Sequence, residues 1–142
     1  MINYESHLES ARMNVLSADQ TSIKSACLST HYATKSNIDA ILIISGTRVS
    51  DEEKNCAVRH AFAAYKFSHR ANKLLVEIQK LYTDVIAFID IINKFNVSKC
   101  ITDGMIRDIY EKSLRSLMHA ETIKLMEDKS RKCHQVIDDI KR

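Results

Sequence analysis

Three side chains that can bind metal ions, Glu53, Cys56 and His60, follow one another at intervals of three and four residues. Carboxylate, thiolate and imidazole are all zinc ligands, so on a helix they would form half of a zinc site. Cys133 or His134 would have to complete the site from another helix. A half-site without its matching half is weak evidence. A buried thiol beside a helix-capping glutamate is the simpler interpretation, so the sequence predicts no metal site and no cofactor.

A second pair with catalytic side chains is Arg115 and His119, one helical turn apart. It resembles the Arg-His pair of small helical ribonucleases of the HEPN type, although the spacing here is shorter than in that family. The resemblance would imply a small helical ribonuclease-like enzyme. Glycine-rich phosphate loops are absent from the sequence. We therefore expect a protein that is not an enzyme, and the ribonuclease-like reading ranks third among the possible functions.

The composition favours a few long helices joined by short loops. The chain has 142 residues, no proline and only two glycines, so it has few of the residues that hairpins and tight turns require. Hydrophobic residues make up 45% and charged residues 27%, which is typical of a folded globular protein. We expect a single all-α domain over residues 1–142: an elongated antiparallel bundle of three long helices plus a short N-terminal helix.

The four cysteines are spread along the chain without a Cys-x-x-Cys pair, which predicts reduced thiols and a cytoplasmic protein. No N-terminal secretory pattern is visible, and the most apolar run, residues 85–95, is interrupted by Asp90. We therefore expect no membrane partner. The net charge of +3 permits an anionic partner without requiring one.

Residues 50–95 predict one long helix, because the run contains neither glycine nor proline. Ser50 and Glu53 form a capping box at its start, and we expect its end near residues 96–99. Apolar residues fill three adjacent heptad columns, a stripe wide enough for a helix that packs against two neighbours. The first column, which we expect to be buried, contains Ala57, Ala64, Ala71, Ile78, Val85 and Ile92.

The other helices are predicted from weaker patterns. A short helix should cover residues 4–16, and the Ser17–Gln20 capping box should begin a second helix near residue 18. That second helix would bury Ile23, Cys27, Ile38, Ile41 and Ile44. The polar stretch 29–37 could break it, and residues 40–45 could also form a β-strand. We favour the helix. The last helix should run from about 103 to 141, with Thr102 as its N-cap and Ile101 and Ile106 as a hydrophobic staple.

Three apolar residues of the long helix, Val58, Phe62 and Tyr65, lie outside its main stripe. A helix that is apolar nearly all round is either central in its fold or packs against another chain. We predict that these three residues form an interface with a protein partner or with a second copy of the chain. The favoured function is thus a non-enzymatic protein–protein interaction module: a homo-oligomer, an adaptor or a chaperone-like binding partner.

Basic residues form one further column on the same helix. Arg59, Lys66, Lys73, Lys80 and Lys94 recur at heptad spacing, with Ala87 as the only gap. Such a row could follow the phosphate backbone of a nucleic acid, but more often it is the solvated side of a bundle helix. The column contains no aromatic residue on which bases could stack. Nucleic-acid binding is therefore the alternative function and not the favoured one.

Overall fold

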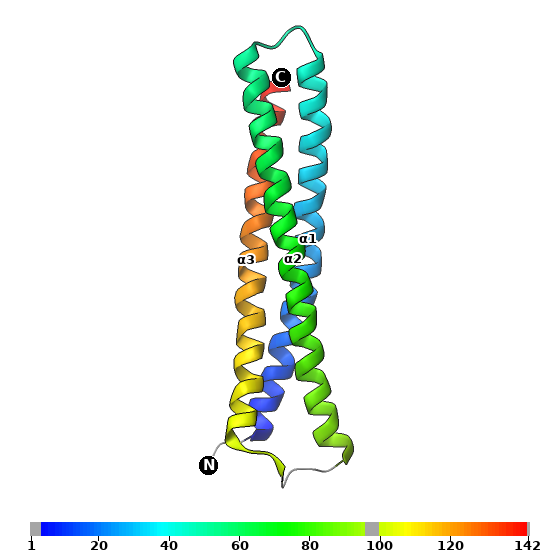
Figure 1. The fold of residues 1–142 in the computed structure, drawn as a ribbon, viewed down its shortest axis with the longest axis vertical. Coiled ribbons are helices and arrows are strands. Elements are labelled where there is room, and N and C mark those ends of the chain that lie inside the picture. Colours follow the sequence, from blue (N-terminus) through cyan, green and yellow to red (C-terminus); the bar gives the residue numbers. More distant parts are fainter. Residues whose placement is uncertain (1–3, 96–99, 142) are drawn as a thin grey trace. The chain divides into compact units, whose positions relative to one another are not determined.

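A computed structural model describes residues 4–95 and 100–141 of the chain. It contains three α-helices, α1 (Tyr4–Ser45), α2 (Asp51–Phe95) and α3 (Asp103–Lys141) (Figure 1). The predicted all-α fold with three long helices that pack against each other is confirmed, and the described residues form no strand. The chain divides into two compact units, one of residues 1–22 and 74–121 and the other of residues 23–73 and 122–142. Each helix contributes one segment to each unit.

The predicted short N-terminal helix is wrong, because residues 4–45 form one continuous helix. The Ser17–Gln20 pattern does not begin a helix. Instead, the Ser17 carbonyl accepts a hydrogen bond from the Thr21 hydroxyl at 2.9 Å, within the helix. A capping box stabilises a helix start only where the preceding chain leaves the helix, and no glycine or proline breaks α1 here.

The predicted buried face of α1 is also wrong. Its large apolar residues at that face, Ile23, Ile38, Ile41 and Ile44, are between 44% and 57% exposed, and Cys27 is exposed as well. Small residues occupy most of the buried positions instead: Ala26, Ser29, Ala33, Ser36 and Ala40, followed by Ile43. Helices that approach closely need small side chains between them. The size of the residues, and not their hydrophobicity, therefore determines which face of α1 is buried.

The predicted start, continuity and first buried column of α2 are confirmed. The Glu53 N–H donates to Ser50 Oγ (3.2 Å) and the Ser50 N–H donates to Glu53 Oε1 (3.4 Å), which completes the capping box. Every residue of the first apolar column is buried. The predicted end at residues 96–99 lies outside the described residues.

The start of α3 also agrees with its prediction. Thr102 Oγ1 accepts a hydrogen bond from the Met105 N–H at 3.2 Å, as expected of an N-cap. Ile101 packs against the cluster that contains Ile106, consistent with the hydrophobic staple. The buried face of α3 includes four polar or weakly polar positions, Ser113, Ser116, Ser130 and Cys133. The apolar Leu114 and Leu125 are 40% and 48% exposed.

The first unit has a core of large apolar side chains from all three helices. Leu8, Ala11 and Val15 of α1 pack with Val85, Ile89 and Ile92 of α2 and with Ile106 and Ile109 of α3. Asn14 donates to Ser113 Oγ across the unit at 3.2 Å, which gives one buried serine a partner.

The second unit has a core of much smaller side chains. Near the α1–α2 loop, Ala40 and Ile43 pack with Ala57, Ala61 and Ile137. Farther from the loop, Ala33 packs with Ala64 and Cys133. These contacts set the register between α1 and α3, that is, which of their residues face each other. In this register the Ser29 and Ser130 hydroxyls form a hydrogen bond of 2.8 Å.

Two serines of α1 provide a test of this polar core. Ser29 and Ser36 are both fully buried, but among the described atoms Ser36 Oγ has no hydrogen-bond partner. An unsatisfied buried hydroxyl costs about 1–3 kcal/mol, and alanine also has a better helix propensity. We therefore expect Ser36→Ala to raise the free energy of unfolding by about 1 kcal/mol or more in urea denaturation. The matched change Ser29→Ala removes a made hydrogen bond and should give no such gain. Equal effects of the two changes would contradict this account of the core.

Among the described residues, none of the three helices contains a stretch apolar enough, over the length required, to cross a membrane.

Candidate functional site

The three residues predicted as an interface line a groove in the second unit. Val58, Phe62 and Tyr65 are 48%, 59% and 57% exposed. They lie outside the buried stripe of α2, as the sequence predicts. Together with α1 they enclose a hollow of about 320 Å³, which we call the apolar groove, lined by Asn37, Ala40, Ile41, Ile44, Val58, Ala61, Phe62 and Tyr65.

The second wall of the apolar groove comes from the last turns of α1. Ile41 and Ile44, 57% and 44% exposed, are lining residues that the sequence analysis placed in the core. Ile38 and Leu42, 54% and 60% exposed, add further apolar surface to the same turns of α1. Patches of several large exposed apolar residues are uncommon on monomeric proteins and often mark binding surfaces.

The charged residues near the groove are two basic side chains and one acidic one. Of the lining residues, all of which the structure describes, none is charged. Lys66 Nζ lies 4.7 Å from the centre of the Phe62 ring. Arg59 and the acidic Glu52 both line a neighbouring hollow together with Val58 and Phe62. The Tyr65 ring stacks on His69 with 6.2 Å between the ring centres. Two basic side chains therefore border the aromatic wall of the groove.

The five residues of the basic column are all exposed. Arg59, Lys66 and Lys73 belong to the second unit, and Lys80 and Lys94 belong to the first. The ammonium groups of Lys66 and Lys94 lie over the rings of Phe62 and Phe95, the second at 5.8 Å. Both aromatic rings of these pairs lie outside the column itself.

The three residues that could have formed half of a zinc site, which the sequence did not favour, have other partners. Glu53 takes part in the capping box of α2. His60 Nδ1 lies 2.8 Å from the Cys56 carbonyl oxygen and 3.5 Å from Cys56 Sγ. Burial raises the pKa of the Cys133 thiol, so this thiol stays protonated and is a poor nucleophile and metal ligand. All four cysteines are free thiols.

The Arg115–His119 pair is not brought together as a catalytic site. Arg115 is exposed, whereas His119 Nε2 lies 3.2 Å from Glu77 Oε2 of α2 in the first unit. This contact between two helices accounts for the position of the histidine.

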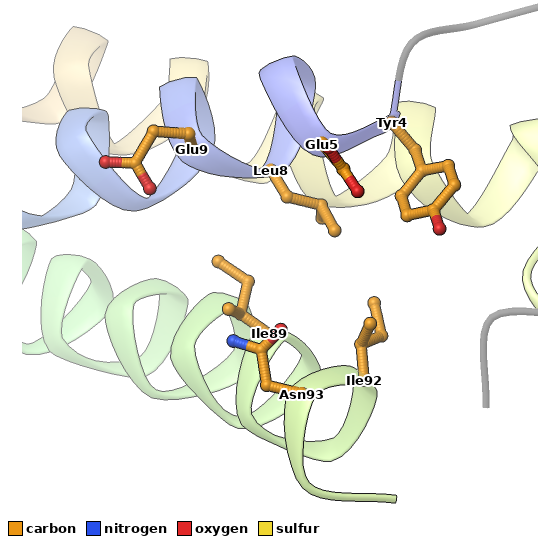
Figure 2. Close-up of a pocket in the computed structure, with 7 residues that line it drawn as sticks. All are labelled: Tyr4, Glu5, Leu8, Glu9, Ile89, Ile92 and Asn93. Atoms are coloured by element: carbon orange, nitrogen blue, oxygen red, sulfur yellow. The ribbon is translucent and has the colours of Figure 1, made fainter. Parts of the chain in front are cut away.

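A second hollow lies in the first unit, between the start of α1 and the end of α2 (Figure 2). It encloses about 370 Å³ and has an apolar floor of Leu8, Ile89 and Ile92, which also belong to the core. Glu9 at its edge forms an ion pair with Arg12 at 2.8 Å. The hydrogen bond from Arg12 lowers the pKa of Glu9, so this carboxylate stays ionised at neutral pH.

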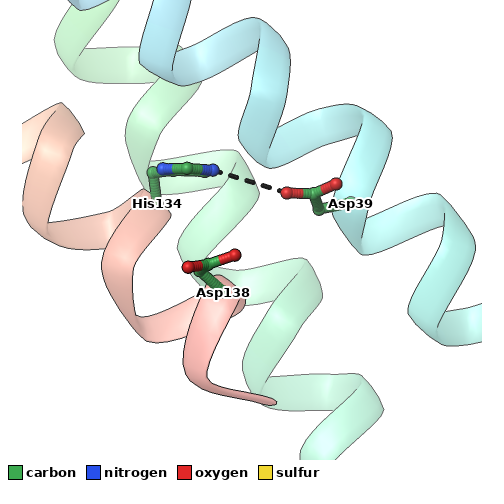
Figure 3. A group of neighbouring side chains, drawn as sticks. All are labelled: Asp39, His134 and Asp138. Carbon is green, nitrogen blue, oxygen red and sulfur yellow. Dashed lines mark ion pairs between the residues drawn. The ribbon is translucent and has the colours of Figure 1, made fainter. Parts of the chain in front are cut away.

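One cluster of polar side chains was not found from the sequence. Asp39 of α1 lies in the second unit beside His134 and Asp138 of α3, and the ligand atoms of the three lie within 4.8 Å of one another (Figure 3). His134 and Asp138 are four residues apart on one helix, a signal that the sequence does contain. Asp39 reaches them only through the packing of α1 against α3.

Comparison with known proteins adds no family to this description: the chain matches no family model, no curated protein and no solved structure.

Proposed function

We propose that this protein is a non-enzymatic interaction module that binds an amphipathic helix of a partner protein in the apolar groove of its second unit. The observation that carries the proposal is the set of five large apolar side chains that line the groove and are 44% to 59% exposed. Helices bind in such grooves through apolar residues at positions i, i+3, i+4 and i+7.

The two basic side chains beside the groove, against the one acidic Glu52, favour a partner helix with acidic flanks. The groove itself is uncharged, and Arg59 and Lys66 border its aromatic wall. Acidic residues beside the apolar face of the partner would pair with these two side chains and would speed association. A second copy of the chain would bring Glu52 together with Arg59 and Lys66 to the same surface, and the crosslinked peptide distinguishes such a copy from a separate partner.

Nucleic-acid binding through the basic column has less support. The column contains no aromatic residue for base stacking, and the Lys66 ammonium already lies over the Phe62 ring. The alternative predicts affinity that falls steeply with salt, whereas binding in the apolar groove depends mainly on apolar burial.

Photocrosslinking from within the groove tests the proposal. We expect benzoylphenylalanine at position 62 to form a crosslinked adduct in cells of the source organism. Sequencing of the crosslinked peptide should show apolar residues at helical spacing with Asp or Glu beside them. The control places the same photoreactive group at position 76, where Val76 is 50% exposed but belongs to the first unit.

Two results would contradict the proposal. Equal labelling of one partner from positions 62 and 76 would show that the groove does not select it. A crosslinked peptide from residues 37–65 of the same chain would show that the occupant is a second copy.

A further inference from the structure

Two helices of the second unit bring three metal-binding side chains together (Figure 3). His134 and Asp138 lie one turn apart on α3, and the dashed line in the figure joins His134 to Asp39 of α1. The Asp39 side chain is only 12% exposed and that of His134 is 17% exposed. A carboxylate this deeply buried needs a nearby positive charge to offset the loss of solvation.

The distances at Asp39 suit a shared cation as well as an ion pair. Asp39 Oδ2 lies 3.4 Å from His134 Nε2, which is longer than a usual N–H···O hydrogen bond of about 2.7–3.2 Å. Two ligands on one tetrahedral zinc ion, each about 2.0–2.1 Å from the metal, are separated by about 3.4 Å. The pair is therefore spaced as two zinc ligands are.

We propose that Asp39 Oδ2, His134 Nε2 and the Asp138 carboxylate bind a divalent transition-metal ion of the Zn²⁺ type. One imidazole and two carboxylates are borderline and hard ligands, and they leave a fourth position open to water. The three ligand atoms all lie within 4.8 Å of one another, so small side-chain movements would complete the site around an ion. The Tyr32 ring packs 6.0 Å from the His134 ring and helps to fix its orientation.

Lys141 acts as the competitor of the metal. Its ammonium lies 3.1 Å from Asp39 Oδ1 and is the cation that this carboxylate binds in the structure. Lys141 is 39% exposed, so its ammonium can turn to solvent when a metal arrives. Metal binding would then link α1 to α3. The link would lie close to the apolar groove, because Ala40, the residue after Asp39, lines that groove.

Calorimetric titration of the chelator-treated full chain with ZnCl₂ tests this proposal. We expect one ion per chain. We expect His134→Gln and Asp138→Asn each to weaken binding by at least about 100-fold, more than is usual when a residue that only orients a metal ligand is lost. The matched control is His60→Gln, which alters the Cys56–His60 pair and should leave the affinity unchanged. Co²⁺ in place of Zn²⁺ should show visible absorption without a thiolate-to-metal band in the near ultraviolet.

Lys141→Met distinguishes a metal site from a purely structural ion pair. Removal of the competing ammonium should tighten Zn²⁺ binding by roughly tenfold, which is about 1.4 kcal/mol. Far-ultraviolet circular dichroism of each variant checks that the helices remain. The proposal would be overturned if the chain bound no Zn²⁺, if Lys141→Met bound it more weakly, or if His134→Gln bound it unchanged. A thiolate band that disappeared with His60→Gln would also overturn it, because the metal would then lie at Cys56.

Discussion

Replacement of Ile43 by alanine is expected to destabilise the protein by about 2–5 kcal/mol, because Ile43 is a core residue of the second unit. Its side chain is 5% exposed and packs with Ala40, Ala57, Ala61 and Ile137. The three alanines around it have no long side chains that could turn into the vacated space, so any closure must come from Ile137, Val49 or Ile140. Urea denaturation followed by circular dichroism measures the change in the free energy of unfolding.

The matched control lies two residues away on the same helix. Ile41 is 57% exposed, so Ile41→Ala should change the free energy of unfolding by no more than about 0.5 kcal/mol. The pair also tests the corrected burial of α1, since the sequence pattern placed Ile41 in the core. Similar losses for the two variants would mean that the buried face of α1 is not the one described.

The double change Phe62→Ser and Tyr65→Ser should abolish most helix binding and leave the fold intact. The rings are 59% and 57% exposed, so the bundle depends little on them. Complete burial of an aromatic or large aliphatic side chain contributes about 1.5–3 kcal/mol. Loss of both contacts should therefore weaken partner binding by about 2–4 kcal/mol, or roughly 30- to 900-fold in Kd.

A control for this variant is available in the same unit. Leu125 of α3 is 48% exposed and does not line the groove, so Leu125→Ser should leave partner binding unchanged. Helicity and thermal unfolding should remain close to those of the unaltered chain in both variants. If the Phe62/Tyr65 variant unfolds instead, these rings belong to the core and the binding-surface proposal is wrong.

How well the fold could be predicted differed between helices for a physical reason. In α2 a capping box marks the start, and apolar residues from Ala57 to Ile92 recur at heptad spacing, so its start and its buried column could be predicted. In α1 alanine and serine fill most of the buried positions of the second unit. Helices packed this closely have room only for small residues between them. A search for large apolar side chains therefore identifies the exposed face of α1 and not the buried one.

The candidate site was predictable only where one helix defines it. Val58, Phe62 and Tyr65 stand out because they lie off the stripe of their own helix. Ile41 and Ile44 join them through the packing of α1 on α2, which the sequence of either helix does not reveal. The same holds for Asp39, whose position beside His134 depends on the register between α1 and α3.

The central claim, that the groove holds an acidic amphipathic helix, is tested most directly by one affinity comparison. Two synthetic helices share the same apolar face, and one carries Glu and the other Lys beside it. We expect the unaltered chain to bind the Glu helix at least about tenfold tighter, because Arg59 and Lys66 border the groove, and we expect added salt to reduce this difference. Equal affinity for the two helices, or no binding of either, would contradict the claim.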